Sequence, residues 1–155
     1  MSITTRATVD PGINTGIALW VDNNSIPLIE SFSIQSGIGE MKQLFFLCSQ
    51  FQKVMARYRP KECYIESDEF WKGDLRSETS AARGNLALLS HIIGAYYGIS
   101  CQLRIDCHFI KAREWKGQMN KDIVARRVEM AIGLKYTSSH ITDAVGIGLA
   151  LRGVL

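Results

Sequence analysis

The chain has 155 residues, of which 46% are hydrophobic and 21% are charged, and its formal net charge is +3. This length and composition are typical of a globular domain with a hydrophobic core, and they exclude a disordered or fibrous chain. No apolar run reaches the roughly 18–20 residues that a membrane span needs, and the N-terminus lacks the apolar core of a secretion signal. We therefore expect a single domain over residues 1–155, located in the cytoplasm and without a membrane partner.

The cysteines and the net charge give weaker indications. The four cysteines are scattered and form no CxxC pair, so we interpret them as reduced thiols, in agreement with a cytoplasmic location. The mild positive charge is compatible with a nucleic-acid partner but does not require one. The positions of the charges are therefore more informative than their sum.

The first third of the chain predicts three strands and a helix. Residues 5–9, 17–21 and 26–34 are rich in β-branched and apolar residues and are separated by turns rich in Gly, Asn and Asp. Short links between consecutive strands predict an antiparallel meander. A helix is expected over residues 40–58, where apolar residues recur at three- and four-residue steps. Its predicted buried stripe consists of Met41, Leu44, Phe45, Cys48, Phe51, Met55 and Tyr58.

The remainder predicts alternating strands and helices. Residues 62–66 predict a fourth strand, which the crossover rule places parallel to the first strand. There follow a predicted loop (67–76), a helix (78–97), a fifth strand (99–105), an irregular basic segment (107–117) and two helices (120–132 and 138–152). We attribute Gly94, inside the second helix, to close packing against another backbone. The order of elements predicts an α/β fold with a five-stranded mixed sheet, an antiparallel meander plus parallel strands, flanked by helices.

Four residues at strand ends and at a helix start have side chains that can bind a metal ion. Asp10 ends the first predicted strand, and Glu66 ends the fourth. His140 and Asp143 lie three residues apart at the start of the last helix, so they share one face of that helix. If the first and fourth strands are neighbours, their carboxylates end side by side. Oxygen and nitrogen ligands without a thiolate favour a hard divalent cation such as Mg²⁺, for which Mn²⁺ can substitute.

Each of these residues alone has an ordinary explanation. An Asp before Pro-Gly is common in turns, and a Glu at a strand end is usually solvated. Asp143 could complement the helix dipole, and His140 could be a polar residue near a helix cap. The metal hypothesis therefore depends on the combination. Two such ions about 3.5–4 Å apart can activate a water and stabilise the leaving oxygen in phosphodiester cleavage.

Three motifs resemble those of RuvC-type Holliday junction resolvases of the ribonuclease H-like superfamily. They are DPGINTG at residues 10–16, YIES at 64–67 and HITDAVGIGLAL at 140–151. The resemblance implies a ribonuclease H-like fold and a homodimeric, structure-specific endodeoxyribonuclease that resolves four-way DNA junctions by paired nicks. It also implies that Asp10, Glu66, His140 and Asp143 bind two Mg²⁺ ions per subunit, with His140 either a ligand or a proton-transfer group. The compressed first turn is typical of a phage-type or otherwise divergent member.

The resemblance also implies contacts with DNA. In this family an aromatic residue after the Ile-Glu strand helps to open the junction, and Phe70 and Trp71 occupy the matching loop. The basic residues that we expect to contact phosphate are Lys72, Arg76, Lys116 and Lys121, with Lys121 favoured because it starts a helix. The ordinary alternatives are aromatics that anchor the loop in the core and basic residues on a solvated surface.

Two other functions stay open, and a third is disfavoured. The chain could be a related nuclease that acts on RNA or on other branched nucleic acids, or a junction-binding protein that does not cleave. Sugar kinases and actin-like ATPases have a similar Asp-x-Gly turn and share the core topology, but they need two lobes. A chain of 155 residues has room for one lobe, so we expect no nucleotide cofactor.

Overall fold

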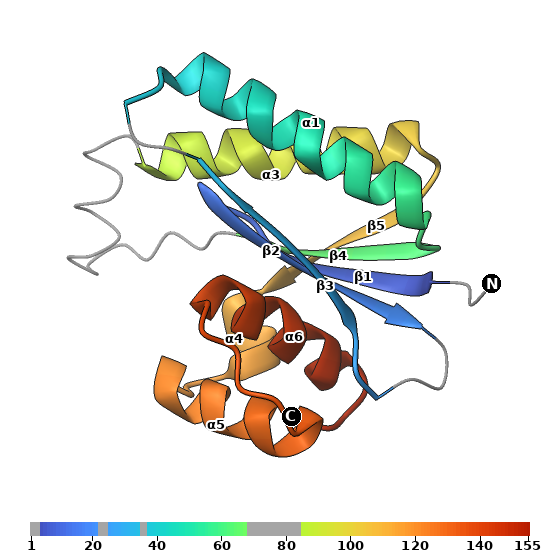
Figure 1. Ribbon diagram of the computed structural model, residues 1–155, viewed down its shortest axis with the longest axis vertical. Coiled ribbons are helices and arrows are strands. Elements are labelled where there is room, and N and C mark those ends of the chain that lie inside the picture. The colour runs from blue at the N-terminus through green and yellow to red at the C-terminus, as the bar shows by residue number, and fades with distance from the viewer. Residues whose placement is uncertain (1–3, 22–24, 35–36, 68–84) are drawn as a thin grey trace.

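The computed structural model describes residues 4–21, 25–34, 37–67 and 85–155 (Figure 1). Its sheet contains five strands in the order β3-β2-β1-β4-β5. The strands are β1 (Thr4–Asp10), β2 (Asn14–Val21), β3 (Leu28–Ser33), β4 (Glu62–Ser67) and β5 (Asp106–Lys111). β2 is antiparallel to β1 and to β3, whereas β4 is parallel to β1 and to β5. The predicted mixed sheet, with a meander followed by parallel strands, is confirmed.

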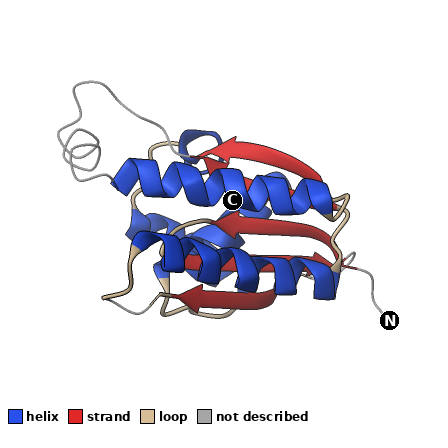
Figure 2. Ribbon diagram, turned by 90° about the horizontal axis from the view of Figure 1, so that it is seen from above, coloured by secondary structure: helices blue, strands red, loops and turns tan. Residues whose placement is uncertain are grey.

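Helices cover both faces of the sheet. One layer consists of α1 (Glu40–Tyr58) and α3 (Asn85–Gln102), which lie side by side over the strands (Figures 1 and 2). The other consists of α4 (Ala112–Lys116), α5 (Lys121–Ile132) and α6 (Ser139–Leu151), with α6 against β1 and β2. Successive strand residues point to opposite faces, so Val9 and Ile65 enter the core under α1 and α3 while Trp20 enters the core under α6. No helix among the described residues is long and apolar enough to cross a membrane.

The predicted fifth strand at 99–105 is wrong. Residues 99–102 continue α3, where the Ser100 hydroxyl donates to the Tyr96 carbonyl at 2.9 Å, and the fifth strand begins at Asp106. Arg104, with a left-handed φ of 58°, turns the chain between the helix and the strand. The apolar run from Ile99 to Ile105 is too short for its periodicity to distinguish the two structures. The segment predicted to be irregular, 107–117, contains most of β5 and all of α4.

Of two packing predictions for the helices, one is confirmed in part and one is wrong. In the predicted stripe of α1, Phe51 and Met55 are buried and Leu44 and Tyr58 pack against the core, whereas Met41 and Phe45 are 79% and 77% exposed. The sequence of α1 offers two overlapping apolar stripes, and only one of them faces the sheet. Gly94 is not in close contact with another backbone, because a Cβ added there would meet nothing within 4 Å.

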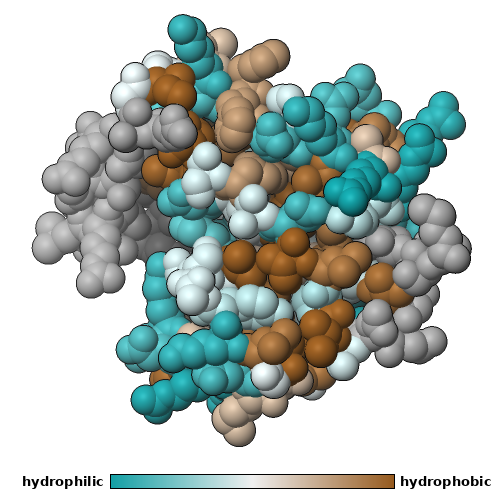
Figure 3. All heavy atoms as spheres, viewed as in Figure 1, coloured by the Kyte–Doolittle hydropathy of each residue, from teal (hydrophilic) through white to brown (hydrophobic). Residues whose placement is uncertain are grey.

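The edges of the sheet and its centre differ in surface character. β3 and β5 are edge strands, and each exposes an apolar side chain: Leu28 and Phe109 are both 51% exposed. Apolar side chains gather at the level of the sheet on the face shown in Figure 3. β1 and β4 are interior strands, so the carboxylates that end them are held on the best-supported part of the sheet.

Candidate metal centre

Asp10 ends β1, and Glu66 is the last but one residue of the neighbouring strand β4, at the same edge of the sheet. β1 and β4 are parallel and Val9 pairs with Ile65, so the next residue on each strand is one of the two carboxylates. The side chain of Asp10 is 13% exposed. The structure therefore brings together the two strand-end carboxylates that the sequence singled out.

The start of α6 adds the other two predicted ligands. His140 Nδ1 lies 2.7 Å from Asp10 Oδ2, which joins the helix to the end of β1. Asp143 lies one turn further along α6 and is 9% exposed. The four side chains thus come from β1, β4 and the first turns of α6, as the spacing predicted.

Gly16 lets α6 approach the sheet this closely. It pairs with Asp10 across β1 and β2, and a Cβ at this position would overlap the backbone of His140 and Ile141. A second attachment lies one turn further along, where the buried Thr8 hydroxyl donates to the Ala144 carbonyl at 2.7 Å. α6 is therefore fixed on β1 at two points that flank Asp143.

Trp115 was not predicted to take part in the site. Its indole Nε1 donates to Glu66 Oε2 at 2.8 Å, and the residue is only 4% exposed. The ring fits against α6 at Gly146, where a Cβ would lie 2.6 Å from ring atom Cζ3. A signal was present in the sequence: Gly146 and Gly148 interrupt the last helix, and glycine inside a helix costs about 1 kcal/mol, which indicates close packing.

Burial and neighbouring negative charge raise the pKa of Glu66 and of Asp143. Burial, and then the charge of Asp10, raise the pKa of Glu66 to about 7. Burial, and then Asp10, also raise the pKa of Asp143. The hydrogen bond to Asp10 raises the pKa of His140 although burial opposes it. Negative charge is therefore concentrated here beyond what the surrounding groups neutralise.

Two of the predicted basic residues lie near these carboxylates. The charge of Lys116 lowers the pKa of Glu66 and of Asp143, and Lys121 also lowers the pKa of Asp143. Lys116 Nζ lies 5.0 Å from the centre of the Trp115 ring. A hollow of about 180 Å³ adjoins Asp143 between the starts of α5 and α6, and Lys121 and Ser139 line it. The remaining predicted contacts with nucleic acid lie outside the described residues: Phe70, Trp71, Lys72 and Arg76.

The donor set fits a hard divalent cation in its chemistry. It offers carboxylate oxygens and one imidazole, without a thiolate, and a cation would relieve the repulsion that raises the pKa of Glu66. As the side chains stand, no three His, Cys, Asp or Glu residues of the described ranges are grouped closely enough to hold an ion. One oxygen of Asp10 is bonded to His140 and one of Glu66 to Trp115. Ion binding would therefore require the side chains to draw closer together, and it could use the other oxygen of Asp10 and of Glu66 while these two bonds persist.

Comparisons with known proteins find similar structures but no similar sequences. No family model matches the chain, and no curated protein matches it. Thermus thermophilus RuvC in complex with a Holliday junction substrate is 18% identical, with a TM-score of 0.74 over 94% of this chain and 90% of that chain. A second Thermus thermophilus RuvC structure is 19% identical, with a TM-score of 0.71 over 94% and 91%. Fowlpox virus resolvase, in complex with Holliday junction DNA, is 16% identical, with a TM-score of 0.59 over 97% and 99%.

These similarities establish the fold. The strand order, with helices on both faces, is the ribonuclease H-like arrangement found in RuvC, and the predicted fold is confirmed. The chain spans at least 90% of each of these three structures, so the resemblance covers the sheet and both helical layers.

Proposed function

We propose that this chain is a metal-dependent, structure-specific endodeoxyribonuclease that resolves four-way DNA junctions by paired nicks. The supporting observation is the convergence of Asp10, Glu66, His140 and Asp143 at one end of the sheet. The same fold occurs in a RuvC complex with a Holliday junction substrate and in a poxvirus resolvase complex with junction DNA. An oxygen-rich, negatively charged site on this fold suits metal-assisted hydrolysis of phosphodiesters.

The four residues would divide the work of holding two ions. Asp10 is bonded to His140, and its charge acts on both Glu66 and Asp143, so it would help to hold both ions, with Glu66 on one and the pair of His140 and Asp143 on the other. Bound Mg²⁺, or Mn²⁺ in its place, would supply charge stabilisation at the phosphate and an activated water. Because Nδ1 of His140 faces Asp10, its Nε2 is the nitrogen that would act as a ligand or move a proton.

The DNA backbone would be held beside the carboxylates. Lys116 and Lys121 both act electrostatically on Asp143, so a phosphate bound by them would lie next to that residue. The hollow lined by Lys121 and Ser139 would take a phosphate adjoining the scissile one. We assign Lys72 and Arg76 to further phosphate contacts, and Phe70 and Trp71 to stacking on unpaired bases, which contributes about 1–3 kcal/mol per base.

The functional unit that we propose is a homodimer. A two-fold dimer presents two equal sites to a two-fold junction, which explains paired nicks. The outer face of α3 is suited to meet a second copy, because Gly94 and Gly98 are exposed and a Cβ on either would meet nothing within 4 Å. Sedimentation of the protein alone and with junction DNA tests this assembly.

Cleavage of a synthetic four-way junction by two carboxamide variants tests the proposed function. Asp10→Asn and Asp143→Asn should bind the junction with nearly unchanged affinity, whereas cleavage with Mg²⁺ should fall by about 10³-fold or more, because metal ligands are lost. The matched control is Asp106→Asn, which removes one negative charge at the start of β5, away from the site. It should cut at the wild-type rate.

The substrate panel separates the alternatives. Linear duplex, a flapped duplex and RNA duplex are compared with the junction, in Mg²⁺ and in Mn²⁺. Normal cutting by Asp10→Asn would contradict the metal site. Preferential cutting of RNA or flaps would support the related nuclease, and tight junction binding without cutting by the wild type would indicate a non-cleaving binding protein.

A further inference from the structure

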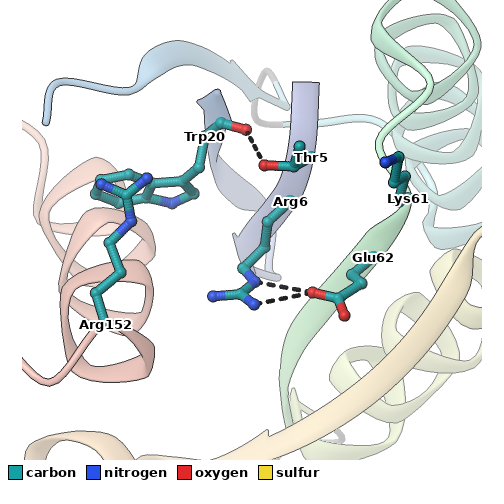
Figure 4. Close-up of a pocket in the computed structure, with 6 residues that line it drawn as sticks. All are labelled: Thr5, Arg6, Trp20, Lys61, Glu62 and Arg152. Atoms are coloured by element: carbon teal, nitrogen blue, oxygen red, sulfur yellow. Dashed lines mark hydrogen bonds and ion pairs between the residues drawn. The ribbon is translucent and has the colours of Figure 1, made fainter. Parts of the chain in front are cut away.

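The end of the sheet opposite Asp10 is lined by cations. One hollow of about 430 Å³ is bordered by Arg59, Lys61 and Arg104, between the ends of α1 and α3. A second hollow, of about 330 Å³, shares Lys61 and adds Arg6 and Arg152 (Figure 4). We call these five residues the basic end: Arg6, Arg59, Lys61, Arg104 and Arg152.

Three of these five cations have no acidic partner among the described residues. Arg6 pairs with Glu62 at 2.9 Å, and Arg152 lies over the Trp20 ring, 4.5 Å from its centre (Figure 4). Arg59, Lys61 and Arg104 are exposed, and none of them is paired with an acidic side chain of the described residues. The first hollow is thus bordered by three cations and no carboxylate.

Complementing the helix dipoles does not explain these charges. α1, α3 and α6 all end on this side, and a helix C-terminus has an effective charge of about −0.5, which favours a nearby Arg. Even with Arg6 and Arg152 left aside, the charges of Arg59, Lys61 and Arg104 exceed those of the ends of α1 and α3 together with the nearby Asp106. The basic end therefore has a net positive charge.

The stability of the fold does not explain why these positions hold Arg59 and Arg104 rather than glycines either. Their φ angles are 45° and 58°, in the left-handed region where glycine is the favoured residue. A side chain there costs roughly 1–2 kcal/mol, whereas a cation at a helix end gains about 0.3–1 kcal/mol. At both positions glycine would serve the fold at least as well as arginine. The guanidinium groups therefore point to an external partner.

The backbone that presents these side chains is firmly fixed. The Arg59 N–H donates to the Met55 carbonyl at 2.9 Å, and the Lys61 N–H donates to the Thr5 carbonyl at 3.2 Å. The Lys61 carbonyl in turn accepts from Asp106 N–H at 3.0 Å. These bonds connect the starts of β1 and β5 through Lys61, so the cations are arranged before any partner binds.

We propose that the basic end binds the phosphate backbone of a second nucleic-acid segment while the carboxylate end acts on the first. β1 has seven residues, so the two ends lie roughly 20 Å apart and a phosphate at one cannot reach the other. Four of the five cations are arginines, whose planar fork suits phosphate oxygens. The inference rests on the proposed function for its choice of nucleic acid over other polyanions.

Glycine substitutions test the basic end without harming the fold. Arg59→Gly combined with Arg104→Gly removes two charges at positions whose backbone conformation favours glycine, so stability should be maintained. Binding of a fluorescent linear duplex is measured by anisotropy between 50 and 200 mM salt, without divalent metal. We expect about a tenfold lower affinity at low salt and a salt slope smaller by about two, because two phosphate contacts are lost.

Matched variants exclude a general effect of charge. Lys42→Gln combined with Lys53→Gln removes two positive charges from the exposed side of α1 and should bind like wild type. Arg59→Lys combined with Arg104→Lys should recover most of the affinity. Wild-type affinity and salt slope in the double glycine variant would overturn the proposal, as would an equal loss in the Lys42/Lys53 variant.

Two further outcomes distinguish this proposal from the proposed function. Absence of junction cleavage by the wild type would contradict the proposed function, and it would leave the comparison of duplex binding measurable, because that comparison uses no divalent metal. A polyglutamate peptide is offered as a second probe. Tighter binding of this peptide than of duplex, lost in the double glycine variant, would make an acidic polypeptide the partner and overturn the assignment to nucleic acid.

Discussion

The two helical layers contact the same sheet in different ways. Under α1 and α3 the contacts are mainly between large apolar side chains, and the two helices also meet through Phe51 and Tyr96, whose stacked rings have centres 4.0 Å apart. Under α6 the contacts with the sheet include backbone on backbone at Gly16 and the Trp20 indole on Gly148, and Trp115 of α4 packs on Gly146 within the layer. The first layer buries apolar area, whereas the second also fixes where the ligand-bearing helix lies.

This difference predicts different responses to change. A layer of large flexible side chains can absorb a small change by repacking. A layer that depends on the absence of a Cβ cannot, because the opposing atoms are backbone or the fixed rings of buried side chains. Disturbance of α6 should therefore affect stability and metal binding together.

The largest effect is expected for Gly148→Ala. The new Cβ would overlap the indole of Trp20, which is 1% exposed and whose Nε1 donates to the Thr8 hydroxyl at 2.9 Å. We expect a loss of about 3 kcal/mol in the free energy of unfolding, measured by urea denaturation. A loss below about 1 kcal/mol would show that Trp20 can move aside, and the contrast between the layers would be wrong.

The pH dependence of stability tests the charge on the α6 side. The pKa of Glu66 rises from an ordinary 4.5 to about 7 on folding, so between these values the folded state binds more protons than the unfolded state. Raising the pH through this range should lower the free energy of unfolding in the absence of metal, by up to about 3 kcal/mol at this site. The raised pKa values of Asp143 and His140 act in the same direction.

Glu66→Gln isolates this contribution. The free energy of unfolding of the wild type is compared with that of the variant from about pH 4.5 to about pH 8. As the pH rises, any advantage of the wild type should shrink or reverse in favour of the variant, because the glutamine does not ionise. Added Mg²⁺ should stabilise the wild type more at pH 8 than at pH 5. If the free energies of unfolding of the two proteins differed by the same amount at every pH, Glu66 would not be desolvated in the folded protein.

Most of the fold could be predicted from the sequence because its signals are local and periodic. The meander, the first helix, the fourth strand and the last two helices follow from turns, caps and apolar spacing. The fifth strand could not, because the run from Ile99 to Ile105 is equally apolar as helix or strand, and its contacts with the core decide. The buried face of α1 could be predicted only in part for a similar reason: the sheet selects one of two overlapping apolar stripes, which leaves Met41 and Phe45 exposed.

The positions of the four candidate ligands in the fold could be predicted, but the contacts that hold their side chains could not. Asp10, Glu66, His140 and Asp143 stand at ends of elements, where sequence patterns are readable. The bond from Trp115 to Glu66 joins α4 to β4, and no sequence spacing specifies such a contact. Residues 68–84 contain the other predicted DNA contacts and lie outside the described ranges, so these assignments stay predictions.

A smaller effect is expected for Trp115→Phe. The phenyl ring can still pack against Gly146, but it cannot donate to Glu66, so the carboxylate loses its orientation. We expect Mg²⁺ affinity, measured by calorimetric titration, to fall by about tenfold, the lower range for loss of a group that orients a metal ligand. Junction affinity without metal should be unchanged.

Trp20→Phe is the matched control for this change. It removes another buried indole N–H, one that bonds to Thr8 rather than to a predicted ligand. It should lower stability while leaving Mg²⁺ affinity at the wild-type value. Equal Mg²⁺ affinities in the two variants would rule out Trp115 as a positioning residue for Glu66.

The smallest effect, a gain in stability, is expected for Gly94→Ala on α3. The residue is exposed within a helix and a Cβ would meet nothing, so the change should stabilise the isolated chain by about 0.5–1 kcal/mol through helix propensity. Unfolding is measured at protein concentrations below and above any dimer dissociation. If the variant is more stable than the wild type at both concentrations, this face of α3 is open. If it is more stable at the low concentration and less stable when dimers form, α3 packs against a second copy. A loss at both would mean that the two layers are equally intolerant of an added methyl group.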